Sequence, residues 1–403
     1  MSSHQDERLA AVGGPIWTPV FKVLAIVAIS GVIVSLWRFW VGIGPASALT
    51  DAYPWGSWKI LNVIVLTALG SGGYALALLV YVLNKGMYHP LVRTAILTSA
   101  VGYTTGVIAL VVDIGRPWNM VNMARPWEWN LHSVLLEIAV CVSAYMIFLW
   151  LEMGEPIIEG WAQAKDTRLR AVARKIGPYV HKYFPWVIAT AVLLPTLHQS
   201  SLGSLFLLAG PRLHPLWQTP FIPLLFLLSC YAMGYAAVVI ATYLSAYVWD
   251  TDPHHRMVAK LSKVMAWVLV VFLVIRWADV LNRLSVAEIF GSGTYTWLFL
   301  IETMFLAVPG LALLSMKVRG DPGSSFRMAM IIVVGGGLYR LNAALIGFMP
   351  GDGFSYFPSV LELTITFGFV AMGIMGYLYF VKRFPILGER LPAGRTAEPG
   401  ANV

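Results

Sequence analysis

The chain has 403 residues, of which 58% are apolar and only 12% are charged. Soluble domains have roughly 45–50% apolar and about 25% charged residues, so this composition, with a mean hydropathy of +0.72, excludes an ordinary soluble protein and predicts an all-α integral membrane protein. We assign the formal net charge of +8 to membrane topology and expect no nucleic-acid partner.

Ten apolar segments are long enough to cross a membrane, since a spanning helix needs about 20 mostly apolar residues. They lie near residues 19–41, 57–83, 91–113, 130–152, 183–208, 219–249, 258–282, 294–316, 326–348 and 358–381. Prolines at 195, 211, 220 and 223 leave the ends of the fifth and sixth segments open. The charged stretch 153–182 is expected to be a solvated, partly helical connector.

The basic residues predict the topology. If the N-terminus is cytoplasmic, 20 of the 28 lysines and arginines fall on the inner side of the membrane, as the positive-inside rule requires. The other eight lie in outer loops or within spans: Arg38, Lys59, Arg116, Arg125, Arg212, Arg276, Arg283 and Arg340. The alternation over ten segments therefore predicts that both termini are inside.

On this topology, the ionisable residues that enter the spans gather in the outer half of the membrane. A charge at mid-bilayer costs roughly 2.5–3.5 kcal/mol on insertion scales, so such residues are expected to be paired or to line a cavity. We expect a buried charge network of Arg276, Asp279, Glu302 and Arg340. Asp113 and Arg116 are three residues apart, which also allows a local ion pair.

Several polar residues of this outer half keep both a functional and a structural interpretation. Glu137 has no basic neighbour one turn away in its own segment, which favours a proton carrier. Tyr103 is either a core aromatic residue or a proton relay, because its hydroxyl needs a partner at that depth. His132 and His198 are either ligand contacts or histidines satisfied by the protein. Gly70–Gly73 predicts close helix packing, or else space for a flat ligand.

Metal and redox centres are not expected on this chain. Cys141 and Cys230 both lie in apolar runs and there is no CxxC motif, so neither an iron–sulfur cluster nor a structural zinc is predicted. A membrane haem needs histidines that face each other from two spans. Only His132, His198 and His214 lie toward the outer face, and none has a spaced partner on its own span. We therefore expect no haem, and electrons would have to come from a partner.

Short stretches spread over residues 50 to about 375 match a family pattern. They are Tyr-Pro-Trp-Gly (53–56), Gly-Gly-Tyr-Ala-Leu-Ala (72–77), Tyr-His-Pro-Leu-Val-Arg (88–93), Asp-Ile-Gly-Arg (113–116), Ser-Val-Leu-Leu-Glu (133–137), Leu-Pro-Thr-Leu-His-Gln-Ser-Ser-Leu-Gly-Ser-Leu (194–205), His-Pro-Leu-Trp-Gln (214–218) and Tyr-Phe-Pro-Ser (356–359). In these stretches the chain resembles the NrfD/PsrC-type integral membrane subunits, in particular the HybB branch, the membrane subunits of hydrogenase-2-type NiFe-hydrogenases.

The resemblance implies two four-helix bundles plus two flanking helices, and a quinone site near the outer face of the first bundle. We divide the chain into a cytoplasmic tail (1–18), a first flanking helix with an outer loop (19–56), a first bundle with the quinone site (57–208), a second bundle (209–348), a last flanking helix (349–384) and a second cytoplasmic tail (385–403). For proton transfer the candidates are Glu137, Tyr103 and Asp113. For quinone binding they are His198, Gln199, His132, Arg116, Trp55 and Trp58.

The function expected from the resemblance is a quinone-reactive anchor in the cytoplasmic membrane. It would pass electrons to menaquinone or ubiquinone from a ferredoxin-like iron–sulfur subunit and from the small and large subunits of a NiFe-hydrogenase on the periplasmic face. The same role in a molybdopterin, sulfur-compound or multihaem quinol-oxidising complex stays open. Two functions of other classes also stay open: a secondary transporter or ion channel, and a purely structural anchor.

Overall fold

The computed structural model describes residues 11–53 and 55–387, without the side chain of residue 181, so the outer parts of both expected tails lie outside the described residues. The described chain is mainly helical. The α-helices are α1 (Pro19–Val41), α2 (Ile43–Ala46), α3 (Ser57–Lys59), α4 (Leu66–Leu69), α5 (Gly72–Ala77), α6 (Val92–Asp113), α7 (Val134–Glu152), α8 (Gly154–Ala162), α9 (Thr167–Leu207), α10 (Ile222–Trp249), α11 (His255–Arg283), α12 (Val286–Gly291), α13 (Thr294–Ala312), α14 (Met316–Arg319), α15 (Pro322–Leu341) and α16 (Val360–Arg383).

Shorter turns of other helix types connect or extend these elements. The π-helical ones are η1 (Ile60–Val65), η2 (Leu78–Val82) and η7 (Asn342–Ile346). The 3₁₀ turns are η3 (Gly86–Leu91), η4 (Pro117–Ala124), η5 (Pro126–Glu128) and η6 (Gly210–Arg212). Each π-helical segment adjoins α-helical residues. The second expected span runs from Ser57 to Val82, with a two-residue turn at Gly70 and Ser71 between α4 and α5.

The prediction of an all-α, multi-pass membrane protein is confirmed. In the part of the chain that the structure describes, nine helical segments are long and apolar enough to cross a membrane. They are Pro19–Val41, Ser57–Val82, Gly86–Asp113, Val134–Ala162, Ile222–Trp249, His255–Arg283, Thr294–Ala312, Pro322–Ile346 and Val360–Arg383. The tenth expected segment, 183–208, is helical within α9, where the His-Gln-Ser-Ser run at 198–201 lowers its hydropathy.

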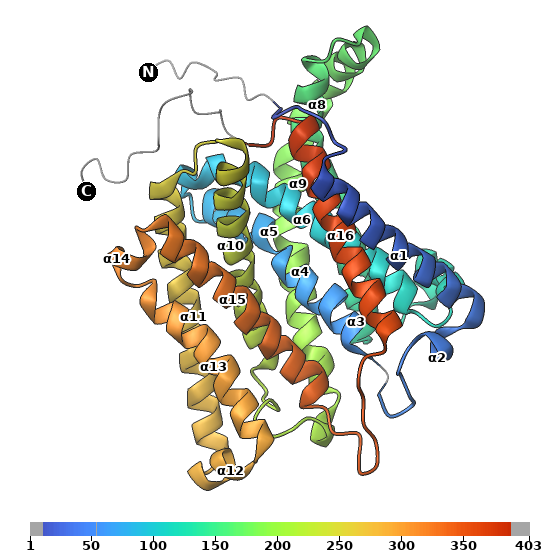
Figure 1. The fold of residues 1–403 in the computed structure, drawn as a ribbon, viewed down its shortest axis with the longest axis vertical. Helices are drawn as coiled ribbons and strands as arrows, with labels where there is room; N and C mark the ends of the chain where they lie inside the picture. The colour runs from blue at the N-terminus through green and yellow to red at the C-terminus, as the bar shows by residue number, and fades with distance from the viewer. Residues whose placement is uncertain (1–10, 54, 388–403) are drawn as a thin grey trace.

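The expected connector at 153–182 is more regular than the sequence suggested. It forms α8 and the first part of α9, whose start is capped by Asp166, because the carboxylate of Asp166 accepts a hydrogen bond from Arg168 N at 2.8 Å. Helix α9 has 41 residues and continues through Pro178, Pro185 and Pro195. At about 1.5 Å per residue it is roughly 60 Å long, and α8 with the start of α9 projects from the upper end in Figure 1.

Three sets of helices pack together. α10, α11, α13 and α15 pack around one another, α7 packs on α6 and α9, and α4 and α5 pack on α6. Helices α1 and α16 form a pair that lies against α6, although they are the first and last long helices of the chain (Figure 1). α10 joins the sets by contacting α4, α5, α6 and α9. The division into domains at residue 208 stays a proposal.

Glycines allow the closest of these approaches. A Cβ added at Gly31 in α1 would lie 2.7 Å from Gly368 Cα in α16. A Cβ added at Gly72 in α5 would lie 2.9 Å from the carbonyl oxygen of Gly234 in α10. Both distances are too short for any side chain, so the Gly70–Gly73 cluster serves helix packing here.

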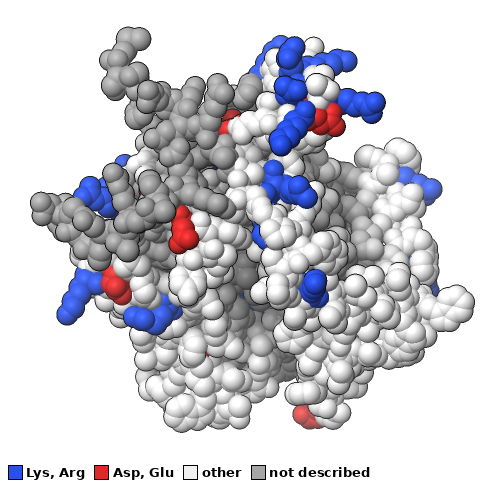
Figure 2. All heavy atoms as spheres, turned by 45° about the horizontal axis from the view of Figure 1, so that its top comes forward, with Lys and Arg blue, Asp and Glu red and all other residues white. Residues whose placement is uncertain are grey.

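The two ends of the molecule differ in charge. We call the end that carries α8 the α8 end, and the opposite end, where α12 and α2 lie, the α12 end (Figure 1). Figure 2 brings the α8 end forward and shows lysine and arginine side chains gathered there. On the start of α9 and the turn before it, the exposed basic residues are Lys165, Arg168, Arg170, Arg174 and Lys175.

Candidate functional site

Two residues of the long 194–205 motif, His198 and Gln199, lie inside the protein on α9, and both are 0% exposed. Gln199 Nε2 donates hydrogen bonds to the hydroxyl oxygen of Tyr103 on α6, at 3.3 Å, and to Thr67 Oγ1 on α4, at 3.2 Å. The His198 ring packs against Tyr103 with ring centroids 5.8 Å apart. The structure thus brings three predicted site residues into one cluster.

Tyr145 on α7 completes this cluster, which we call the His198 cluster: His198, Gln199, Tyr103, Tyr145 and Thr67. The Tyr145 and Tyr103 rings meet edge to face at 4.6 Å. Four buried atoms in the cluster have no hydrogen-bond partner among the described residues: both ring nitrogens of His198, Gln199 Oε1 and the Tyr145 hydroxyl. Buried polar atoms usually are paired, so these atoms suit a polar ligand or ordered water.

Asp113 pairs with a residue that the sequence did not suggest. Its carboxylate Oδ2 lies 2.6 Å from Lys59 Nζ at the C-terminal end of α3. Arg116, the expected partner in a local ion pair, is exposed because the chain leaves the helical path after Asp113, where Ile114 is extended. Arg38 of α1 donates to the Ile114 carbonyl oxygen at 2.6 Å and so reinforces this corner.

The other proton-transfer and histidine candidates of this region lie at the surface of the chain. Glu137 in the first turn of α7 and His132 in the preceding turn are both exposed. No described residue contacts the Glu137 carboxylate through a hydrogen bond or ion pair. Glu137, Tyr103 and Asp113 therefore do not form a directly bonded string, and Glu137 lies at the surface of the described chain.

The two tryptophan candidates pack into the protein near α3. Trp55 donates from its ring nitrogen to the Ala344 carbonyl oxygen in η7 at 2.6 Å and lies against Phe206 and Phe348. Trp58 is buried in a small apolar cluster with residues of α6 and α16, and its ring nitrogen has no hydrogen-bond partner among the described residues. Both side chains thus link α3 to other helices.

The expected charge network is divided in the structure. Arg276 of α11 forms a buried ion pair with Glu302 of α13. The Glu302 carboxylate also accepts from the Trp217 ring nitrogen at 3.1 Å and from Asn342 Nδ2 at 2.6 Å. The Arg276 guanidinium lies 4.7 Å from the ring centroid of Tyr339, so every side of this pair is covered by protein.

Asp279 and Arg340 do not join that pair. Asp279 binds Arg283, one turn later on α11, at 2.6 Å. Arg340 is buried and donates to neutral acceptors, the carbonyl oxygens of Ile64 at 3.0 Å and Phe226 at 2.7 Å. It is partnered by helix carbonyls rather than carboxylates because the π-helical segment η1, which contains Ile64, lies against α15.

Sequence reasoning did not select Lys59, Trp217 and Asn342, which make buried polar contacts with Asp113 or Glu302. It also did not select Tyr145 and Glu152, two buried polar side chains. The available signal was a polar residue within an apolar segment, as with Asn342 in 326–348. Spacing along the chain gave no partner, because Trp217 and Glu302 are 85 positions apart.

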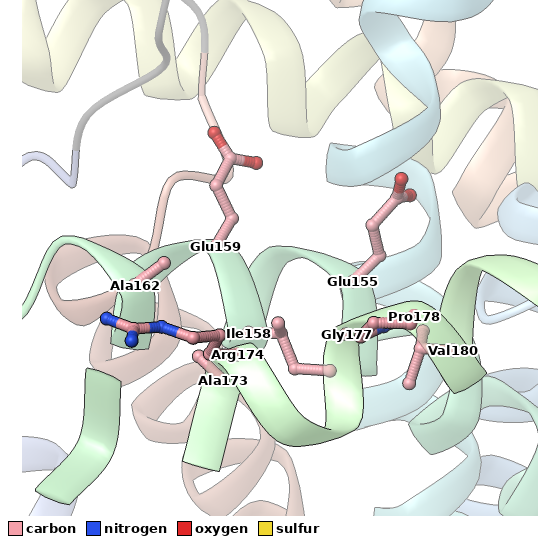
Figure 3. A pocket seen from close by; sticks show the side chains of 9 residues that line it. All are labelled: Glu155, Ile158, Glu159, Ala162, Ala173, Arg174, Gly177, Pro178 and Val180. Atoms are coloured by element: carbon pink, nitrogen blue, oxygen red, sulfur yellow. The ribbon is translucent and has the colours of Figure 1, made fainter. Parts of the chain in front are cut away.

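Two cavities lie at the α8 end. The larger, about 440 Å³, lies between α8 and α9 and is lined by Glu155, Ile158, Glu159, Ala162, Ala173, Arg174, Gly177, Pro178 and Val180. Figure 3 shows the Glu155 and Glu159 side chains leaving α8 in the same direction. The smaller cavity, about 150 Å³, includes Tyr81, His89, Arg93 and Glu152.

No group of three or more metal-ligating side chains occurs within residues 11–53 and 55–387. His214, one of the histidines weighed for haem, packs 4.3 Å from Tyr295, and its Nδ1 accepts from Leu216 N at 3.3 Å. Burial lowers the pKa of His214, so this histidine is a neutral acceptor in a folded loop. The absence of haem stays a prediction.

Comparison with known proteins gives a consistent family match. A family model described as "Polysulphide reductase, NrfD" matches residues 46–342. The "Probable Ni/Fe-hydrogenase 2 b-type cytochrome subunit" of Escherichia coli (strain K12) is 33% identical over 390 residues, 96% of each chain. The "Menaquinone reductase, integral membrane subunit" of Nitratidesulfovibrio vulgaris is 25% identical over 88% of each chain. A selenate reductase subunit of Mesobacillus selenatarsenatis is 25% identical over 55% of each chain.

Proposed function

Because the chain belongs to the polysulphide reductase NrfD family, we propose that it is the quinone-reactive membrane subunit of a respiratory oxidoreductase complex, with a NiFe-hydrogenase as the leading partner. The observation that carries this proposal is the set of four unpartnered polar atoms in the buried His198 cluster. A quinone has two carbonyl oxygens that need hydrogen-bond donors, and its isoprenoid tail is compatible with lipid.

The residues of the cluster suit this substrate. A His198 ring N–H can donate to a quinone carbonyl, while Gln199 is held by Tyr103 and Thr67. Reduction of one quinone to quinol takes up two electrons and two protons. The electrons come from the iron–sulfur clusters of a ferredoxin-like partner subunit, and protein side chains deliver the protons. Menaquinone and ubiquinone both meet these requirements.

The proposed orientation places the α8 end in the cytoplasm and the partner subunits at the α12 end. The basic side chains at the start of α9 support a cytoplasmic α8 end. Trp118 and Trp127, in the turns between α6 and α7, are exposed aromatic side chains outside the spans, and such surfaces favour contact with a partner protein. We place the chain in the cytoplasmic membrane.

A second function of the same kind is favoured by the comparisons. One relative is named as a selenate reductase subunit and another as a menaquinone reductase subunit. In such a complex the His198 cluster would bind the same substrate, but the peripheral enzyme would differ, and electrons would run from quinol outward where the enzyme is a reductase. Co-purification of the chain with its partners identifies which peripheral enzyme it carries.

The test uses the intact complex in membranes and compares two reactions of the same preparation. His198→Phe removes both ring nitrogens and keeps an aromatic ring, and it should lower donor-driven quinone reduction about 100-fold, the typical worth of a positioned proton donor. Dye reduction by the peripheral subunits should not change. His254→Asn, on a histidine at the α8 end that contacts Asp252, is the control.

Glu137→Gln is a second variant that tests the proposed function. If the exposed Glu137 receives or passes protons where quinone enters from lipid or where a partner covers α7, this variant should lose quinone reduction and keep dye reduction. Wild-type quinone reduction in the His198→Phe variant would contradict the proposed site. Insensitivity of the wild-type complex to quinone-site inhibitors would favour a structural anchor, and ion flux without any redox partner would favour a transporter.

A further inference from the structure

The smaller cavity at the α8 end contains a buried carboxylic acid that the proposed function does not use. Glu152, the last residue of α7, is 4% exposed. It lines this cavity of about 150 Å³ together with Tyr81 of η2, His89 of η3, Arg93 of α6 and Glu155 of α8. Among the described residues, none donates a hydrogen bond or forms an ion pair to the Glu152 carboxyl group.

The charged neighbours of Glu152 are already engaged or face outward. Arg93 pairs with Glu159 at 2.7 Å, and one of its guanidinium nitrogens also donates to the Pro385 carbonyl oxygen at 3.0 Å. Glu155 is partly exposed, and His89 is exposed. A carboxyl group left without a counter-ion in such a place is stable in its neutral, protonated form. Glu152 is therefore placed to hold a proton beside a cavity.

Two buried polar side chains, Glu152 and Tyr145, lie on one side of α7, and Tyr145 belongs to the His198 cluster. Tyr145 lies seven residues earlier on the same helix, which puts it on the same face about 10 Å away. Its hydroxyl is buried without a partner, and its ring contacts that of Tyr103 at 4.6 Å. Tyr103 in turn accepts from Gln199 and packs on His198.

Direct hydrogen bonds do not bridge the step from Glu152 to Tyr145, so the step needs water. Buried waters are found where polar atoms would otherwise be unsatisfied, and the Tyr145 hydroxyl is such an atom. A carboxyl group, intervening waters and a tyrosine hydroxyl form a chain in which each proton moves only a short distance.

We propose that Glu152 is the proton-loading residue of a route that enters at the α8 end and supplies the His198 cluster through Tyr145 and Tyr103. This inference rests on the proposed function. For each quinone reduced, two electrons arrive from the iron–sulfur partner, and Glu152 twice binds a proton from the α8 side and releases it inward. Both protons end on the oxygens of the quinol. Glu152 acts on the substrate through Tyr145 and is not itself in contact with it.

The first experiment compares two single carboxyl changes in the intact complex. Glu152→Gln keeps the size of the side chain and removes its ability to carry a proton, and it should lower quinone turnover about 100-fold, within the range of general acid–base effects. The affinity for a quinone-site inhibitor should stay within twofold of wild type. Glu155→Gln, three residues along the chain and at the partly exposed rim of the cavity, should keep wild-type turnover. Glu152→Asp should restore part of the lost turnover.

Tyr145→Phe tests the same route without touching the carboxyl group. It removes only the unpartnered hydroxyl and leaves the ring contact with Tyr103 in place, so we expect this variant to fold. It therefore tests the route even if the Glu152→Gln complex does not assemble. We expect slower quinone turnover with a larger solvent deuterium isotope effect. Tyr247→Phe, an exposed tyrosine near the end of α10, is the matched control.

The direction of proton uptake is measured in vesicles that trap a pH indicator. Orientation is read from protease cleavage of the α8–α9 segment, and protons should be consumed from the compartment that the α8 end faces. Wild-type turnover in both Glu152→Gln and Tyr145→Phe, or proton uptake from the α12 side, would overturn the route and leave the quinone site intact. A wild-type complex that reduces no quinone would instead overturn the proposed function and the route with it.

Discussion

Gln199 and Tyr103 are 96 positions apart in the chain and share a hydrogen bond of 3.3 Å inside the protein. The bond joins α9 to α6, and the second bond of the same amide, to Thr67, joins both helices to α4. The amide of Gln199 therefore fixes the geometry of three helices around the atoms that lack partners.

Replacing Gln199 tests how much its two hydrogen bonds contribute to stability. Gln199→Leu removes both donors and leaves the Tyr103 hydroxyl without its donor in the interior, so the free energy of unfolding should fall by about 1–3 kcal/mol. Thermal unfolding of the detergent-solubilised chain measures the loss. Gln218→Leu, at an exposed position in the loop before α10, should change stability by less than about 0.5 kcal/mol. Equal stability of the two variants would contradict the role of the amide.

The ion pair between Lys59 and Asp113 predicts an asymmetry between two basic residues. Lys59→Met removes the partner 2.6 Å from a buried carboxylate and should cost about 1–3 kcal/mol of unfolding free energy. Arg116→Met, at the exposed position three residues after Asp113, should leave stability within about 0.5 kcal/mol. Thermal unfolding of both variants measures these changes in stability. A larger loss of stability for Arg116→Met would instead support the ion pair between Asp113 and Arg116 that the sequence predicts.

The Arg276–Glu302 pair should be costly to break on one side only. Arg276→Met leaves Glu302 buried without its cation and should lower stability by about 3–5 kcal/mol. Adding Glu302→Gln removes the charge and keeps one acceptor oxygen for Trp217 or Asn342, so the double variant should regain part of that loss. The exposed pair Arg125–Glu128, 3.5 Å apart, is the control, and Arg125→Met should cost at most about 1 kcal/mol.

Tyr356 holds the loop before α16 to α3. Its hydroxyl accepts from Ser57 N at 2.7 Å and donates to Glu362 Oε1 at 2.8 Å. Burial raises the pKa of Tyr356 to about 12. Because the folded pKa lies above the ordinary value near 10, the hydroxyl stabilises the fold fully below pH 10, and this contribution is lost as the pH rises toward 12. Tyr356→Phe should therefore lower the melting temperature at pH 8, and the difference from wild type should shrink at alkaline pH.

The prediction that the chain carries no haem has a direct optical test. His198 is the histidine deepest in the described protein, and its ring is covered by Tyr103, while His214 is folded against Tyr295. A reduced-minus-oxidised absorption spectrum of the purified chain should show no haem band. A haem band that disappears in His198→Phe would overturn the prediction and reassign the His198 cluster.

The sequence predicted where the helices lie much better than what their polar residues contact. The apolar run 19–41 coincides with α1 and 358–381 falls within two residues of α16, since run length and flanking charges are local properties. The partners of Asp113 and Glu302 depended on how separate helices turn toward each other. Nothing in the sequence near Lys59 indicates that it pairs with Asp113. Arg116, three residues after Asp113, has the spacing that favours an ion pair within one helix.

The site residues also differ in how well the sequence predicts their positions. The 194–205 motif and the depth of Tyr103 in its span indicate His198, Gln199 and Tyr103 as site residues, and the structure places them together. The lack of a basic neighbour on its own helix favours Glu137 as a proton carrier, but the same lack also fits its exposed position on α7. Tyr145 and Glu152 lie on one face of one helix, a relation that becomes meaningful only once α6 and the cavity are placed beside it.

The contact between Gly31 and Gly368 has a consequence for biogenesis. Helix α1 leaves the ribosome before its main packing partner, α16, which follows more than 300 residues later. Until α16 has been translated, α1 can pack only against lipid and α6 in the bilayer. A chain cut before residue 360 would therefore keep the His198 cluster and the Arg276–Glu302 pair but lose the partner of its first helix, and we expect membrane quality-control proteases to degrade it.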